Sequence, residues 1–117
     1  GMAIMHFTSV SDGTGESAAL KVEVGNLAAP CDEVAIARIS YATSGMAVDI
    51  YCDADADALL WTCPADHSGE HDFTCHGGPG LKNNGSDGKT GDLKFTTRGH
   101  TAGDTYAITL WLRKRDA

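Results

Sequence analysis

With 117 residues, the chain is long enough for one domain, and its 42% hydrophobic content supports a buried core and excludes a disordered chain. Nine basic and sixteen acidic residues give a formal net charge of −7, which argues against nucleic acid as a partner. No apolar run approaches the roughly 20 residues that a membrane span requires, so we expect no membrane partner.

The start of the chain, GMAIMHFTSV, has neither the basic start nor the long apolar stretch of a signal peptide. We therefore expect production in the cytoplasm and four cysteines that remain thiols in a reducing compartment. We expect one β-sandwich domain over residues 1–117, with residues 1–17 as a flexible or loosely packed N-terminal segment.

Alternation of apolar and polar residues with a period of two predicts four strands in the first half of the chain. These segments, with the residues expected to face the core, are 18–24 (Leu20, Val22, Val24), 33–42 (Val34, Ile36, Ile39, Tyr41), 46–52 (Val48, Ile50, Cys52) and 58–63 (Leu59, Trp61, Cys63). In the second segment the apolar phase slips by one residue after Ile36, which indicates a β-bulge near Ala37 and Arg38.

The second half of the chain predicts three more strands. They are 71–75 with Phe73 in the core, 92–97 with Leu93, Phe95 and Thr97 on one side, and 105–113 with Tyr106, Ile108, Leu110 and Leu112 on one side. Seven strands without a helical stripe predict an all-β fold, either an antiparallel sandwich or a jelly-roll-like barrel. The residues that we expect in its core are Val22, Ile36, Val48, Ile50, Trp61, Phe95, Ile108 and Leu110, because each lies on the apolar phase of its strand.

The longest irregular stretch is residues 76–91, where six glycines and Pro79 predict a mobile surface loop. The segment RGHTAGD, residues 98–104, predicts a turn between the last two strands, with Gly99 and Gly103 in left-handed geometry.

Two short motifs resemble known ligand sites but differ from them in necessary residues. DADADA at 53–58 has the alternating carboxylates of a calcium loop, yet Ala58 stands where that loop needs Gly and Pro64 where it needs Glu. GSDGKTGD at 85–92 contains Gly-Lys-Thr, yet Asn83 stands in place of the first Gly of a phosphate-binding loop, and a strand follows instead of a helix. Both motifs are better explained as turns.

The segment CPADHSGEHDFTCH, residues 63–76, combines thiols and imidazoles, which are the ligands of tetrahedral zinc. Its candidate ligands are Cys63, His67, His71, Cys75 and His76. Pro64 and Gly69 oppose the helix that would align them, and the segment has no Cys-x-x-Cys pair. We therefore expect no metal and no cofactor, and we keep a small metal- or ligand-binding β-domain built on residues 63–76 as the alternative function.

A catalytic set could be drawn from Cys75, His100 and Asp104, but any chain with five histidines permits such a set. Neither a nucleophile elbow nor a paired-carboxylate motif accompanies these residues. We expect no enzymatic activity.

Three large side chains lie off the main apolar phase of their strands: Trp111, Tyr51 and Leu60. If they share a surface, they form an apolar interface for self-association, with Trp111 at or near the contact. A second sheet or the long loop that covers them would account for the pattern equally well, and the sequence leaves both explanations open.

The charges are unevenly distributed along the chain. No Lys or Arg occurs between Arg38 and Lys82, whereas Arg113, Lys114 and Arg115 follow one another at the end. An acidic region and a basic tail suit contacts between subunits.

Three segments that cover about two-fifths of the chain carry a resemblance to a class of proteins. They are GEHDF (69–73), GKTGDLKFTTRGHTAGDTYAITLWLRK (88–114) and VDIYCDADADALLW (48–61). They resemble small proteins encoded among phage structural genes. The resemblance implies a virion component, namely a head-decoration, head-completion or tail-associated β-sandwich that forms a homo-oligomer and contacts other virion proteins.

Overall fold

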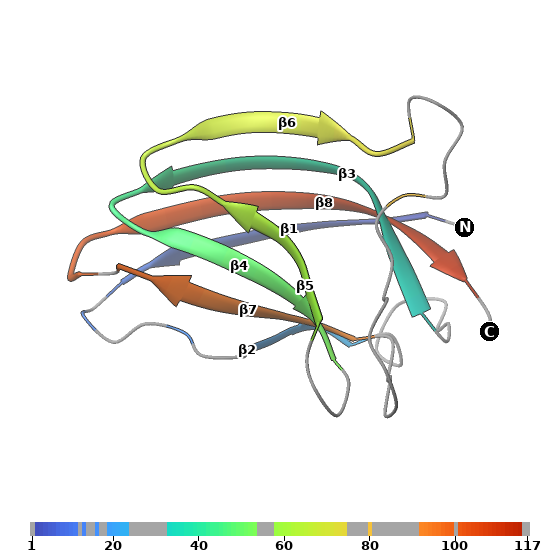
Figure 1. Cartoon of the computed structure of the whole chain (residues 1–117), viewed down its shortest axis with the longest axis horizontal. Coiled ribbons are helices and arrows are strands. Elements are labelled where there is room, and N and C mark those ends of the chain that lie inside the picture. Colours follow the sequence, from blue (N-terminus) through green and yellow to red (C-terminus); the bar gives the residue numbers. More distant parts are fainter. Residues whose placement is uncertain are drawn as a thin grey trace.

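The computed structural model describes residues 2–11, 13, 16, 19–23, 33–53, 58–74, 80, 92–99 and 101–115. Their strands are β1 (Met2–Val10), β2 (Ala19–Val22), β3 (Glu33–Ser44), β4 (Ala47–Cys52), β5 (Ala58–Cys63), β6 (Ser68–Asp72), β7 (Leu93–Arg98) and β8 (Thr105–Arg115). They form two four-stranded antiparallel sheets that pack as a sandwich (Figure 1). Sheet A has the order β1-β8-β3-β6 and sheet B the order β2-β7-β4-β5. The predicted sandwich is confirmed, and no helix that could span a membrane occurs in this part of the chain.

Strand β1 is the element that the sequence did not predict. Residues 1–17 were expected to be loosely packed, but Met2–Val10 pairs with β8 over nine consecutive residues without a register shift. Ala3, Met5 and Phe7 pack against the core, whereas Ile4 and Val10 point to solvent. Because apolar residues occur on both faces of β1, the alternation that reveals the other strands is hidden in this one.

The core between the sheets follows the predicted apolar phase closely. Seven of the eight predicted core residues have no exposed surface, and the eighth, Trp61, is partly buried and packs against them. Phe95 lies at the centre, with its ring in edge contact with Phe7 from β1 and Tyr106 from β8. The two sheets are therefore joined by aromatic contacts from three different strands.

Two β-bulges set the direction of side chains. The predicted bulge in β3 is confirmed, because its pairing with β8 shifts between Ile36 and Arg38. A second bulge, which was not predicted, shifts the pairing of β4 with β5 between Ile50 and Tyr51. It makes Leu60 the extra residue, so Leu60 packs against the core while Leu59 is 55% exposed. The sequence had assigned these two leucines to the opposite faces.

Strand β6 begins earlier than predicted, at Ser68 instead of residue 71. Phe73 was expected in this strand but lies in the turn after it, where it still packs against the core. The backbone N–H of Phe73 donates to the carbonyl of Ala37 at 2.9 Å. Ala37 is the extra residue of the β3 bulge. The turn before β8 is as predicted, with Gly99 at φ 70° and Gly103 at φ 90°. The loop predicted at 76–91 lies outside the described residues except for Gly80.

Candidate functional site

The outer face of sheet A carries three rows of directly paired side chains that cross all four strands. The rows are Ile4–Trp111–Arg38–Asp72, His6–Thr109–Ser40–Glu70 and Thr8–Ala107–Ala42–Ser68. Their members are outward because they alternate with the buried residues of β8 and β3, such as Leu110 and Ile39. The centre of the face consists of small side chains, with Ala42 directly opposite Ala107.

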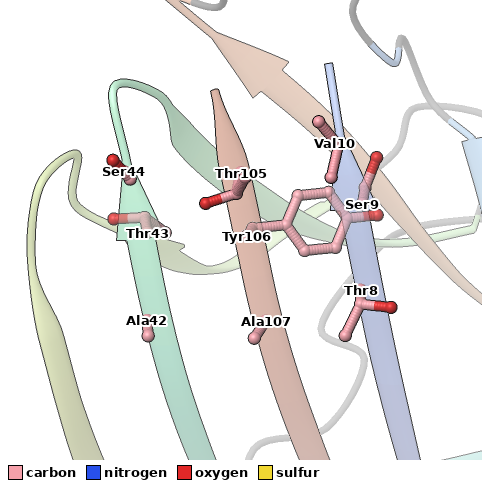
Figure 2. Close-up of a pocket in the computed structure, with 9 residues that line it drawn as sticks. All are labelled: Thr8, Ser9, Val10, Ala42, Thr43, Ser44, Thr105, Tyr106 and Ala107. Atoms are coloured by element: carbon pink, nitrogen blue, oxygen red, sulfur yellow. The ribbon is translucent and has the colours of Figure 1, made fainter. Parts of the chain in front are cut away.

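Small side chains at the centre leave the face hollow. Two adjoining hollows of about 410 Å³ each share Ala42 and Ala107. Figure 2 shows the first hollow, where Ala42 and Ala107 lie side by side on β3 and β8, with Thr8 on β1 beside Ala107 and with Ser44 and Thr105 farther along β3 and β8. The second hollow extends toward His6 and Glu70. The surface therefore offers methyl and hydroxyl groups to a partner over much of its width.

Most charges on this face lie in the half formed by β3 and β6, and Arg113 adds one at the end of β8. The Arg38 guanidinium lies 2.5 Å from the Glu70 carboxylate and 4.9 Å from the centre of the Trp111 ring. The other half, which we call the β1–β8 patch, consists of the outward side chains of Ile4, His6, Thr8, Val10, Thr105, Ala107, Thr109 and Trp111. None of these carries a formal charge when His6 is neutral. Ile4 is 64% exposed and Val10 71%, so the patch has apolar surface available for a partner.

The three residues predicted at an interface occupy three different environments. Trp111 points outward, as expected, and lies between Ile4 and Arg38 in the β1–β8 patch. Tyr51 lies on sheet B, on the opposite side of the sandwich, and Leu60 packs against the core. They therefore do not share one surface. Ile4 and Val10 were missed because β1 itself was not predicted. Once β1 is known to be a strand, the alternation of its side chains places both of them outward.

Cys63, the first candidate metal ligand, is buried at the end of β5. Burial, and secondarily the nearby Asp49 carboxylate, raises the pKa of its thiol to about 12. Zinc binds the thiolate, so a thiol held in its protonated form is a poor ligand.

His67 and His71 contact aromatic side chains and not each other. The His67 ring stacks on Tyr41, whose hydroxyl lies 3.2 Å from its Nδ1. His71 packs between Trp61 and Phe73, with ring centres 5.1 and 5.3 Å away. Cys75 and His76 lie outside the described residues. Within the residues that are described, no three His, Cys, Asp or Glu side chains converge on a point where they could hold a metal.

The contacts of His71 have a structural consequence. Trp61 belongs to β5, the edge strand of sheet B, and His71 belongs to β6, the edge strand of sheet A. With Phe73, which meets Trp61 edge-on at 5.1 Å, these rings cover the gap between the two sheets on this side.

Of the catalytic set considered from the sequence, only Asp104 is described. Its carboxylate accepts hydrogen bonds from the backbone N–H of Thr101 at 2.7 Å and from the Thr101 hydroxyl at 3.0 Å. These bonds close the turn that precedes β8. Cys75 and His100 lie outside the described residues.

An ion pair between the exposed Arg98 and the buried Asp49 lies on the outer face of sheet B. Asp49 is 5% exposed and accepts two hydrogen bonds from Arg98, at 2.7 Å from Nε and 3.1 Å from Nη2. A third comes from the Thr62 hydroxyl at 2.8 Å. The three residues join β4, β7 and β5, so we interpret this cluster as a clamp on sheet B and not as a binding site.

The described residues thus define a β-sandwich with one hollowed sheet face, on which the β1–β8 patch carries no formal charge. Comparison with known proteins assigns it no particular family, because no family model, curated protein or solved structure matches the chain.

Proposed function

We propose that the protein is a non-enzymatic structural subunit of a phage or prophage particle, which acts through protein–protein contacts and self-assembly. The observation that carries the proposal is the β1–β8 patch. A patch without formal charge that contains Trp111 and leaves Ile4 and Val10 more than half exposed has the composition of an interface and not of a solvated surface.

The net charge of the chain favours this patch over the rest of the surface as the contact between copies. At −7, two copies repel each other over most approaches, whereas the β1–β8 patch brings no carboxylate to the contact. Full burial of an Ile or Val side chain stabilises an assembly by about 1.5–3 kcal/mol. Trp111 already has one face against the Arg38 guanidinium, and a partner that covers the indole would add the kind of contact that dominates interface energies.

The assignment to a virion rests on the resemblance of residues 48–61, 69–73 and 88–114 to small proteins encoded among phage structural genes. A decoration, completion or tail-associated subunit works by surface and symmetry. A sandwich with an uncharged patch on one sheet face suits that role. Its partners would be further copies of itself and other virion proteins, and its location would be the particle, after synthesis in the host cytoplasm.

Purified particles test this role. Particles released by the strain that encodes the protein are banded on a density gradient, and their proteins are quantified by mass spectrometry. We expect the chain in the particle band, in fixed ratio to the major capsid or tail protein across gradient fractions. A chain that stays in the soluble fraction while intact particles band without it would contradict the proposal.

A further inference from the structure

We propose that two copies of the chain join through the free edges of their β1 strands, which pair antiparallel across a two-fold axis and merge the two A sheets into one eight-stranded sheet. The inference rests on the self-assembly included in the proposed function and specifies the contact that performs it.

The first argument is that β1 is an unprotected edge. Among the described strands, none pairs with the side of β1 that faces away from β8. Its nine residues, MAIMHFTSV, contain no Pro, no Gly, no Lys or Arg and no acidic residue, and their pairing with β8 has no bulge. Natural sheets normally guard an edge with one of these features, because unpaired N–H and C=O groups recruit another strand.

The other three edges of the sandwich do carry such protection. Strand β6 has five residues and includes Glu70 and Asp72, and β2 has four residues and a register shift. Strand β5 is bulged, and its Trp61 is covered by His71 and Phe73. Pairing through β1 therefore closes the assembly at two copies, since no second open edge remains among these strands to extend it.

The direction of the backbone groups in β1 follows from the residue after it. The Ser11 N–H donates to the carbonyl of Asp104 at 2.7 Å, on the β8 side. Because N–H and C=O directions alternate along a strand, the odd-numbered residues of β1 bond to β8 and the even-numbered ones face the free edge. Ile4, His6, Thr8 and Val10 thus present both their backbone groups to the edge and their side chains to the outer face.

The register that pairs all nine residues places His6 opposite His6 of the second copy. Ile4 then lies opposite Thr8, and Val10 opposite Met2, so no charged residue meets a like charge. Pairing of five even-numbered residues from each copy forms about ten backbone hydrogen bonds. That number matches a typical specific interface. A slip of the register by one hydrogen-bonded step leaves residues at both ends unpaired.

Charge complementarity favours the antiparallel arrangement and a second copy as the occupant. In sheet A, Arg113 lies across from Met2 at one end of β1, and Asp104 adjoins Thr105, which lies across from Val10 at the other end. Antiparallel pairing sets the basic end of each copy beside the acidic end of the other. Arg113 and Asp104 of the two copies then lie three strand spacings apart, about 14 Å.

Two kinds of variant test the contact. Thr8→Pro removes one N–H that faces the free edge but none that bonds to β8, and proline is tolerated at such positions. We expect it to remain folded by circular dichroism, while the mass by light scattering falls from that of two chains to that of one, 12.2 kDa. The control is Thr8→Val, which keeps the N–H and should keep the mass of the wild type.

Cysteine cross-linking tests the register without depending on the proline variant. Opposed residues in a hydrogen-bonded pair have Cα atoms about 5.5 Å apart, within the reach of a disulfide. We expect His6→Cys to form cross-linked dimers on mild oxidation. Ile4→Cys and Thr8→Cys should not do so alone but should cross-link to each other when mixed.

The outcomes separate this inference from the proposed function. If the wild type self-associates but Thr8→Pro keeps its mass and His6→Cys does not cross-link above the wild-type background, pairing through β1 is wrong and self-assembly stands. Cross-linking of Thr8→Cys alone would overturn the register. If the wild type is monomeric at every concentration, both the self-assembly and the β1 contact fail.

Discussion

The buried thiol of Cys63 gives the protein a specific dependence on pH. Its folded-state pKa is raised from 9.0 to about 12, first because burial removes the water that would solvate the thiolate and second because Asp49 repels it. The unfolded chain ionises this thiol at lower pH than the folded one does. The stability that the protonated thiol contributes is therefore complete below pH 9 and is lost as the pH rises toward 12.

The size of this loss follows from the two pKa values. Each pH unit between them costs about 1.4 kcal/mol for one proton. From pH 8 to pH 10, ionisation of the unfolded thiol lowers the free energy of unfolding by about 1.4 kcal/mol. Burial also raises the pKa of Tyr41 and of Tyr106, whose hydroxyl in addition donates to Glu16, so both tyrosines add losses at higher pH.

A comparison with Cys63→Ala separates the thiol from the tyrosines. Both proteins are unfolded in urea with a reductant present at pH 8 and at pH 10, and unfolding is followed by tryptophan fluorescence. The variant is less stable at both values, since it leaves a small cavity, but its decline with pH should be smaller by about 1.4 kcal/mol. Equal declines in the two proteins would refute the protonated, buried thiol, and with it the argument against Cys63 as a zinc ligand.

Three further predictions concern the rest of the fold. Arg98→Ala leaves the buried Asp49 carboxylate without its cation, so it should clearly lower the urea concentration at the midpoint of unfolding. The control Arg113→Ala, at an exposed position, should not change this midpoint. Equal midpoints for the two variants would contradict the clamp. Gly80→Ala should lower the free energy of unfolding by more than Gly103→Ala does. Both glycines have a positive φ, but only at Gly80 would an added Cβ lie 2.6 Å from a backbone carbonyl oxygen, that of Ile36. The left-handed conformation alone costs about 1–2 kcal/mol, so similar losses in calorimetry would contradict this close approach. Protein purified without added metal should carry less than about half an equivalent of zinc, and its melting temperature should not change when chelator is added. A structural zinc site contributes on the order of 10 kcal/mol to folding, so its removal would be evident. Stoichiometric zinc and chelator-induced unfolding would favour the alternative function.

Alternation of apolar residues was sufficient to predict the sandwich where one face of a strand is buried and the other is polar. Strand β7 is of this kind, and β8 is too except for its outward Ala107 and Trp111; the inward residues of both strands were all assigned correctly. The method failed where both faces of a strand are apolar. In β1 the outward Ile4 and Val10 hide the period, and in β5 a bulge that no residue type signals exchanges the environments of Leu59 and Leu60.

The candidate site was predictable only in part for the same reason. The outward direction of Trp111 followed from the phase of β8, which contains no bulge between residues 106 and 112 in its pairing with β1. That Tyr51 lies on the other side of the sandwich depends on which strands pair, and strand order is a long-range property that local alternation does not encode. The β1–β8 patch required the sheet order as well, since its two strands are about 100 residues apart in sequence.

The central claim is that the protein self-associates through the β1 side of sheet A, and the mass of three proteins by light scattering at micromolar concentration tests it most directly. The wild type should be a closed oligomer of two chains. Thr8→Pro should be a folded monomer, because it removes a backbone N–H that the contact between the two β1 strands requires. Leu59→Glu, which changes an exposed apolar side chain on sheet B, should keep the mass of the wild type. A monomeric wild type, or a Thr8→Pro variant that keeps its oligomer, would contradict the claim.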